Sequence, residues 1–147
     1  MKRSVRMKMV RKIAKNQEQV AARNLLKIRQ AFDEQCVRLN ELGDYREQYS
    51  KKLAATGEQG VGAMEINNYR VFVEQLGIAF QQQQLVVERF QSELNQANQE
   101  WTKKRTHTQA VEKLIEGFSS DEQFTENSRE QKILDEYAMR SGFKLGN

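Results

Sequence analysis

Few side chains in this sequence have the types and spacing that chemistry requires. Cys36 is the only cysteine and His107 the only histidine among 147 residues. Cys36 stands at helical spacing from Phe32 and Leu39, which favours a small, buried apolar role over a reactive Cys–His pair. His107 lies in the polar run "KKRTHTQ", where we expect it to be exposed. With no second histidine or cysteine, neither a metal cluster nor a disulfide within the chain can be built on these residues.

Two further patterns could suggest an active site. The stretch "GEQGVG" at 57–62 has the glycines of a phosphate-binding loop, but no Lys-Ser pair follows it and no strand pattern precedes it. The carboxylates Glu41, Asp44 and Glu47 have the spacing of a solvated helix surface, with no cleft to shift their pKa values. We therefore expect no catalytic residue, no cofactor, no metal and no enzymatic activity.

The composition favours long helices. Proline is absent, charged residues make up 30% of the chain, aromatic residues 8%, and the mean hydropathy is −0.82. These values are typical of coiled coils. The apolar fraction of 38% is enough for a narrow seam between helices but not for a thick core.

A first heptad pattern covers about residues 5–55. Apolar residues alternate at spacings of three and four, as the a and d positions of a coiled coil do. Val10, Ile13 and Val20 extend this pattern toward the N-terminus in a slightly shifted frame. The clearer part of this predicted seam consists of Leu25, Ile28, Phe32, Leu39, Leu42, Tyr49 and Leu53, with Gln35 and Arg46 at the polar positions.

A second pattern begins near Met64. Two consecutive steps of four residues between Ala79 and Val87 predict a stutter, which would locally unwind a coiled coil. The seam residues before and after it are Tyr69, Phe72, Leu76, Ala79 and Gln83, then Val87, Phe90, Leu94, Ala97, Trp101, Lys104, Thr108, Val111, Ile115 and Phe118.

A third segment follows Gly117, which could end a helix. Ser119 and Glu122 have capping-box spacing, so a helix over about 120–141 is expected, before a frayed tail "SGFKLGN". Whether this helix continues the second one or kinks from it stays open. Its apolar side would hold Phe124, Ile133, Leu134 and Tyr137.

The glycine cluster in "AATGEQGVGAM" is best explained as a turn. Short connections between helices favour antiparallel neighbours. The predicted fold is all-α: a long antiparallel two-helix coiled-coil hairpin with a C-terminal helical extension, forming one domain over 1–147. Its predicted parts are helix 1 over about 5–55, a turn over about 56–63, helix 2 over about 64–117 and an extension over about 120–141. A turn centred near 59–60 places Leu25 near Leu94, Phe32 near Val87, Leu39 near Phe80 and Leu42 near Leu76.

Charge is unevenly distributed along the chain. Residues 1–29 hold ten Lys or Arg and one acid, Glu18, and a second basic cluster follows at 103–105. The same register would place 101–105 opposite 14–18, so both basic clusters should meet at the open end of the hairpin. Such a surface suits an acidic protein partner, nucleic acid or anionic lipid. We expect neither nucleic-acid binding nor membrane insertion, because recognition modules are absent, the middle of the chain is acidic and residues 1–16 offer little apolar area.

Three stretches carry a resemblance to a known family: "INNYRVFVEQL", "ANQEWTKKR" and "ENSREQKILDEYAMRSGF". In this order and spacing, over nearly the whole chain, the sequence resembles the FliJ family of the bacterial flagellar type III export apparatus. The resemblance implies a non-enzymatic stalk protein of bacterial flagellum biogenesis and motility. Such a protein binds and activates the ring of the export ATPase FliI, associates with its regulator FliH, contacts the export gate FlhA and escorts export chaperones. It would be cytoplasmic and peripheral to the inner membrane through the apparatus.

The resemblance also implies two sets of contact residues. For the export gate and chaperones, the matching positions are Arg38, Leu42, Tyr45, Tyr49, Phe72, Leu76, Ala79 and Gln83. Tyr45 lies off the predicted seam, whereas core packing alone would explain several of the others. For the ATPase ring, the basic candidates are Arg6, Lys8, Arg11, Lys12, Lys15, Lys103, Lys104 and Arg105. A stalk protein of a virulence type III secretion system and, less strongly, a nucleic-acid-binding coiled coil are the alternative functions.

Overall fold

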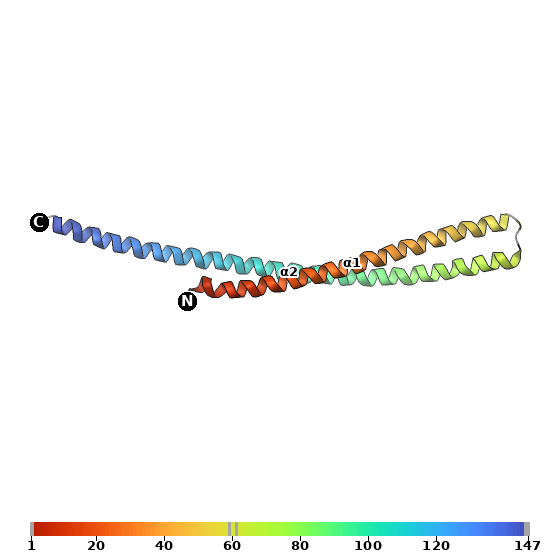
Figure 1. Ribbon diagram of the computed structural model, residues 1–147, viewed down its shortest axis with the longest axis horizontal. Coiled ribbons are helices and arrows are strands. Elements are labelled where there is room, and N and C mark those ends of the chain that lie inside the picture. Colours follow the sequence, from red (N-terminus) through yellow and green to blue (C-terminus); the bar gives the residue numbers. More distant parts are fainter. Residues whose placement is uncertain (1, 59, 61, 146–147) are drawn as a thin grey trace. The chain divides into compact units, whose positions relative to one another are not determined.

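The protein consists of two long helices that pack against each other as an all-α hairpin (Figure 1). A computed structural model describes residues 2–58, 60 and 62–145. Helix α1 covers Arg3–Glu58 and helix α2 covers Ala63–Leu145, and no strand occurs among these residues. The all-α hairpin predicted from the heptad patterns is confirmed.

The turn between the helices depends on one glycine more than on the other two. Gly60 has a φ of 71°, and among the described residues no other has a positive φ. This left-handed conformation favours glycine because a Cβ would crowd the backbone. Gly57 lies inside α1, and the carbonyl of Gly62 accepts hydrogen bonds from the first turn of α2. Positions 59 and 61 of the predicted turn lie outside the described residues.

Helix α2 runs through the point where we considered a boundary. Gly117, Ser119 and Glu122 all lie within α2, so the segment after 117 continues the second helix. The expected capping box is wrong, because no helix starts there and Glu122 instead hydrogen-bonds across to Ser4 of α1. Of the expected tail, residues 146–147 lie outside the described residues.

Contacts between the helices form two compact units: residues 1–20 with 102–147 (unit 1), and residues 21–101 (unit 2). In each unit the two helices run in opposite directions (Figure 1). The expectation of a single domain over 1–147 stays a prediction.

The seam of unit 2 is half-buried. On α1, the predicted apolar seam residues from Leu25 to Leu53 are half-buried as expected, whereas Arg46 is exposed. On α2, half-buried residues follow a strict alternation of three and four: Tyr69, Val73, Leu76, Phe80, Gln83 and Val87.

This alternation removes the predicted stutter of α2. Phe72, which we placed on the seam, is 41% exposed, and Val73 takes its position. Phe80 can enter the seam because it faces Gly43: a Cβ on Gly43 would lie only 3.3 Å from Phe80 Cε2. The absence of a side chain at residue 43 therefore makes room for an aromatic ring.

The core of unit 1 is small and tightly closed. Ala14 is 2% exposed and forms a buried cluster with Val111 and Ile115, against which Met7 packs. Val10, Ile13 and Val20 are exposed, so the shifted frame predicted for them is wrong. The heptad of α1 instead continues unshifted, because a small Ala14 lets the helices approach closely and bury the larger Val111 and Ile115.

Unit 1 also corrects the predicted register. We expected Lys15 opposite Lys104, but its Nζ lies 3.3 Å from a carboxylate oxygen of Glu112. The predicted register would have set basic residues against each other at the seam, which is unfavourable. The observed register places Ala14 against apolar residues and Lys15 beside an acid.

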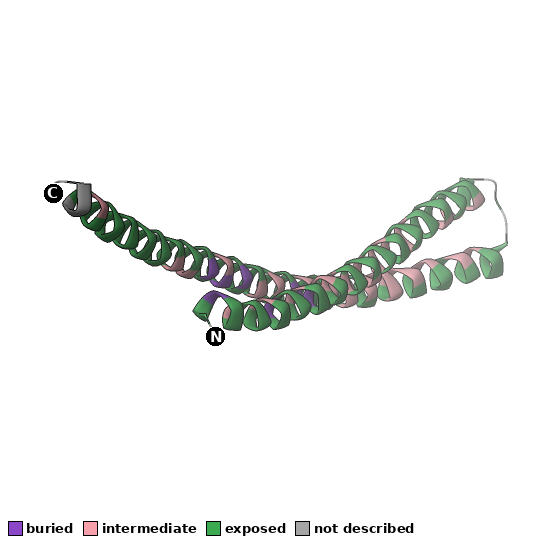
Figure 2. Ribbon diagram, turned by 60° about the vertical axis from the view of Figure 1, so that its left-hand side comes forward, coloured by how far each residue is buried: buried purple, intermediate pink, exposed green. Residues whose placement is uncertain are grey.

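Residues 123–140 of α2 are all exposed (Figure 2). Near the start of this segment, Glu126 forms an ion pair of 3.7 Å with Lys2 of α1. The apolar side chains that we predicted on this segment are present but uncovered: Phe124, Ile133, Leu134 and Tyr137 are between 62% and 74% exposed.

Candidate partner-binding surfaces

An aromatic surface forms in unit 2 close to the turn. The rings of Tyr49 and Phe72 meet edge to face with centroids 4.7 Å apart, and Tyr69 lies 6.3 Å from Tyr49. Both distances suit favourable aromatic pairing. We call Tyr45, Tyr49, Tyr69 and Phe72 the aromatic surface.

The aromatic surface contains both half-buried and exposed side chains. Tyr49 is half-buried, and the ammonium of Lys52 lies 4.7 Å from its ring centroid. A shallow pocket opens beside it, lined by Tyr49, Tyr69 and Phe72 with Glu65 and Asn68. Tyr45 is 52% exposed, as expected from its place off the seam. Partially exposed aromatic rings held by their neighbours are typical anchors for protein partners.

The remaining residues assigned to the gate and chaperones divide between seam and surface. Leu42 and Leu76 are half-buried on the seam, and Ala79 is half-buried next to the seam residue Phe80, so packing between the helices accounts for all three. Arg38 is exposed. The structure thus brings part of this set together near the turn but leaves only Arg38, Tyr45 and Phe72 as exposed members.

Gln83 has a structural partner. Its Nε2 donates to the backbone carbonyl of Gln35 at 3.0 Å and to the side-chain carbonyl of Gln35 at 2.8 Å. Both side chains are half-buried. A satisfied polar pair inside an apolar seam favours one register over others. The sequence placed both residues on the seam but did not predict that they pair.

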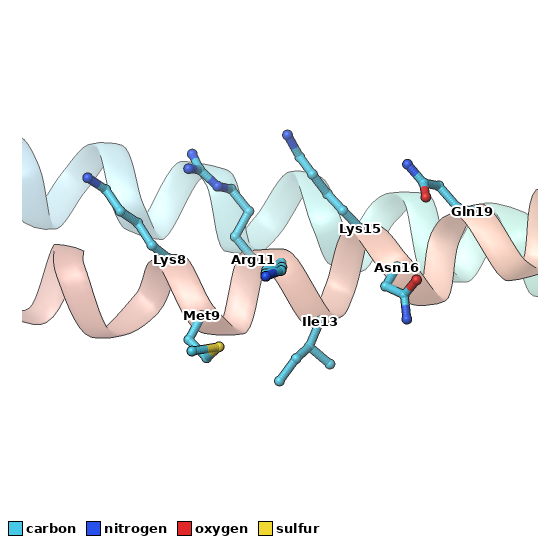
Figure 3. A pocket seen from close by; sticks show the side chains of 8 residues that line it. Lys8, Met9, Arg11, Ile13, Lys15, Asn16 and Gln19 are labelled. Carbon is cyan, nitrogen blue, oxygen red and sulfur yellow. The ribbon is translucent and has the colours of Figure 1, made fainter.

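A basic surface lies on the N-terminal part of α1 in unit 1. Arg6, Lys8 and Lys12 are exposed, and Arg11 is half-buried. Lys8, Arg11 and Lys15 point to one side of α1, whereas Met9 and Ile13 point to the other (Figure 3). We call Lys8, Arg11, Lys12 and Lys15, together with Arg6 on the opposite side of the same helix turns, the basic surface.

The second basic cluster does not lie where it was expected. Lys15 pairs with Glu112, so Glu112 marks the point on α2 opposite Lys15. Lys104 precedes Glu112 by eight residues, which is roughly 12 Å along the helix. Lys103 and Arg105 are exposed, and Lys104 is half-buried with its carbonyl accepting a hydrogen bond from Thr108. The prediction that residues 101–105 lie opposite 14–18 is wrong.

A polar contact missed by sequence analysis joins the helices beside the basic surface. Glu122 accepts hydrogen bonds from the backbone N–H and the hydroxyl of Ser4, and the guanidinium of Arg3 lies 5.7 Å from the Phe118 ring centroid. The pKa of Glu122 lies below its ordinary value, chiefly because its carboxylate accepts the hydrogen bond from the Ser4 hydroxyl. The positive charge of Lys2 lowers this pKa to a smaller extent. Continuing the heptad pattern by four residues beyond Phe118 leads to Glu122. This periodicity is the sequence feature that could have predicted the position of Glu122 on the seam.

Neither a metal site nor a membrane span occurs in the part of the chain that the structure describes. No three His, Cys, Asp or Glu side chains there are grouped so that they could hold a metal ion. No helix within those residues has an apolar stretch long enough to cross a bilayer. Cys36 is a half-buried free thiol.

Comparison with known proteins identifies the family of this helical pair. The model of the family described as "Flagellar FliJ protein" matches residues 1–146. The "Flagellar FliJ protein" of Salmonella typhi and that of Escherichia coli (strain K12) are each 26% identical to the chain over 132 residues. That alignment covers 90% of this chain and 90% of each relative. No solved structure matches. Because the family model covers nearly the whole sequence, the protein belongs to the family of flagellar FliJ proteins, which are components of the flagellar export apparatus.

Proposed function

We propose that this protein is a non-enzymatic, stalk-like subunit that binds and activates the ring of the flagellar export ATPase FliI. In this proposal the regulator FliH is a further associate. The protein also contacts the export gate FlhA and escorts export chaperones. It works in the cytoplasm, at the inner-membrane face of the export apparatus.

The observation that carries the ATPase part of the proposal is the basic surface of α1. Arg6, Lys8 and Lys12 are exposed on one short stretch of helix. Long, mobile cationic side chains accelerate association with acidic surfaces and tolerate several similar subunits in turn. Lys15 contributes less than its sequence position suggests, because Glu112 already neutralises it.

The aromatic surface supports the gate and chaperone part. Tyr45 and Phe72 are exposed beside the half-buried Tyr49. Aromatic side chains are enriched among residues that dominate binding energy at protein interfaces. Leu42, Leu76 and Ala79 would act indirectly, by holding the two helices that present these rings.

The test measures ATP hydrolysis by the purified cognate ATPase with and without this protein. The wild type should raise the rate, and the triple variant Arg6→Glu/Lys8→Glu/Lys12→Glu should lose most of that stimulation while keeping its far-UV helicity. Tyr45→Ala is the matched control, because it changes the aromatic surface alone and should stimulate like the wild type. Equal stimulation by the charge-reversed variant would refute the role of the basic surface.

The gate contact is tested separately with the cytoplasmic part of the export gate. Tyr45→Ala should weaken its binding at least about tenfold, the scale of an interface hot spot. The charge-reversed variant should bind the gate as the wild type does. Unchanged gate binding by Tyr45→Ala would remove this aromatic residue from the interface.

A further inference from the structure

The side of α1 that faces away from α2 in unit 1 carries exposed apolar residues. Val5, Met9, Ile13 and Val20 lie within a sector of about 80° around the helix, since successive residues are about 100° apart. They are between 44% and 64% exposed. Ala14, which packs against α2, lies about 100–180° around α1 from all four. We call these four residues the outer stripe.

The outer stripe is a consequence of the observed packing of α1. The predicted frame would have buried Ile13 and Val20 in the seam, whereas the close packing of Ala14 turns both residues outward. In Figure 3, Met9 and Ile13 point away from the side of α1 on which the labelled basic side chains lie. The apolar area available to a partner is therefore larger than the heptad pattern indicated.

The charge around the outer stripe is of one sign. Residues 2–20 hold seven Lys or Arg and one acid, Glu18. Arg6 lies about 20° from Ile13 and Lys12 about 20° from Val5, so both basic residues adjoin the outer stripe. Glu18 is half-buried and lies about 140–180° around the helix from the outer stripe.

Carboxylates of α2 neutralise part of the positive charge of α1. Glu112 lies 3.3 Å from Lys15, and Glu126 lies 3.7 Å from Lys2. Arg6, Lys8 and Lys12 lie between these two ion pairs along α1, and all three are exposed. The charge that faces outward therefore comes mainly from these three residues.

An anionic lipid surface fits this combination of side chains. On such a surface, apolar side chains of a helix enter the boundary between head groups and acyl chains. Neighbouring Lys and Arg side chains extend sideways to the lipid phosphates, and each adds electrostatic attraction. Nucleic acid would also attract the charge, but contacts to its phosphates would leave the outer stripe exposed to water.

We propose that the outer side of α1 in unit 1 binds reversibly to an anionic membrane surface, with the helix parallel to the bilayer. Met9 and Ile13 enter the head-group boundary, while Arg6, Lys8 and Lys12 bind lipid phosphates. The helix does not cross the bilayer, and in unit 1 α2 lies on the side of α1 away from the lipid. Because the outer stripe is short and lacks aromatic residues, electrostatic attraction supplies most of the affinity.

Cosedimentation of the full-length protein with sucrose-loaded vesicles tests the proposal. We expect binding to vesicles of phosphatidylglycerol and phosphatidylcholine to be at least about tenfold tighter than binding to phosphatidylcholine alone. Added salt should weaken it, because mobile ions screen the attraction. The assay contains no ATPase, and the proposal does not rest on the proposed function, so either can fail without the other.

Charge reversal beside the outer stripe should weaken binding to the anionic vesicles. Arg6→Glu/Lys12→Glu should reduce the affinity at least about tenfold. Arg129→Glu/Lys132→Glu is the matched control, because it changes the net charge equally at two exposed residues of α2. The control should reduce the affinity less than about threefold, since attraction falls off over a Debye length. Equal losses would overturn the assignment to this side of α1.

Apolar variants test the contact without changing charge. Met9→Gln/Ile13→Gln should weaken binding to the anionic vesicles at least about fivefold, because affinity depends on the apolar area buried. Ile133→Gln/Met139→Gln is the control, because both of these residues are exposed on α2, and it should bind like the wild type. Far-UV circular dichroism establishes that each variant keeps its helices.

A fluorophore reports which side of unit 1 meets the lipid. It is attached to a single cysteine, Asn16→Cys or Thr106→Cys, in a Cys36→Ala background. Asn16 is exposed within the sector of the outer stripe, whereas Thr106 is exposed about 140° around α2 from Val111, which faces α1. A polarity-sensitive fluorophore should shift to the blue on anionic vesicles at residue 16 and stay unchanged at residue 106.

Three results would overturn the proposal. The first is equal binding, or no binding, to anionic and neutral vesicles. The second is an apolar variant that binds like the wild type while duplex DNA displaces both from the vesicles, which would show a general polyanion surface. The third is an equal fluorescence shift at residues 16 and 106.

Discussion

Glu122 of α2 closes the first turn of α1 by accepting two hydrogen bonds from Ser4. Its Oε2 lies 2.6 Å from the Ser4 hydroxyl, and its Oε1 lies 3.2 Å from the Ser4 backbone nitrogen. The first turn of α1 contains no acidic residue of its own. Glu122 therefore supplies from the other helix the negative charge and the acceptor that a helix N-terminus needs.

Stability should depend on pH through this contact. The pKa of Glu122 is lowered from an ordinary value of 4.5, chiefly by the Ser4 hydroxyl. Because the pKa of Glu122 is lower in the folded state, its carboxylate stabilises the fold fully at pH values above the ordinary pKa. This stabilisation is lost as the pH falls through the lowered pKa. Thermal unfolding of wild type and Glu122→Gln should therefore differ at pH 7, and this difference should shrink as the pH falls below 4.5 and through the lowered pKa. A difference that stays constant with pH would contradict this role of the carboxylate, and Ser4→Ala should show the same convergence.

Two isoleucines of unit 1 should respond very differently to truncation. Ile115→Ala should lower the free energy of unfolding by about 2–5 kcal/mol, because it leaves a cavity beside Val111 and Ala14. Ile13→Ala should change it by no more than about 0.5 kcal/mol, because Ile13 is exposed. Denaturant unfolding measures both. Equal losses would mean that the heptad of α1 is shifted after all.

The glutamine pair of unit 2 should show strong coupling. Gln83→Leu leaves the Gln35 side chain without its donor and should cost about 1–3 kcal/mol. The double variant Gln35→Leu/Gln83→Leu should recover most of that loss, because two apolar residues suit the seam. A double-mutant cycle gives the coupling energy. Additive losses would show that the pair contributes nothing beyond its separate side chains.

Two glycine substitutions should have opposite signs. Gly117→Ala should stabilise the protein by about 0.5–1 kcal/mol, because residue 117 lies inside α2 and a Cβ there meets nothing within 4 Å. Gly60→Ala should destabilise it by about 1–2 kcal/mol, because its φ is 71°. Thermal melts compare the two directly. Destabilisation by Gly117→Ala would indicate a helix end at that residue.

Alanine substitutions of two tyrosines on the aromatic surface should distinguish an effect on partner binding from an effect on the free energy of unfolding. Tyr49→Ala should cost about 1–3 kcal/mol of unfolding free energy, because it removes the ring that contacts Tyr69 and Phe72. Tyr45→Ala should leave the melting temperature nearly unchanged while it weakens partner binding, because Tyr45 is exposed. Melts and gate-binding titrations of the same samples make the comparison. If both tyrosines changed stability equally, Tyr45 would belong to the packing.

Much of the fold is visible in the sequence because heptads record which helix face must be buried. The seam residues from Leu25 to Leu53 and from Val87 to Phe118 follow the predicted pattern, and the glycine cluster marks the reversal. The aromatic and basic candidates could be identified by residue type alone. Even the open question after Gly117 was limited to two outcomes, a continued helix or a kink.

Only the tertiary structure decided the register and the exposure of individual side chains. Hydropathy favoured Val10, Ile13 and Val20 at the seam, whereas close packing selects the smaller Ala14 and leaves those larger residues outside. Likewise, Gly43 admits Phe80, and Glu112 rather than a basic residue lies beside Lys15. Periodicity fixes which side of a helix is buried, but which residues meet across the seam depends on shape and charge complementarity between two helices, which no single helix records.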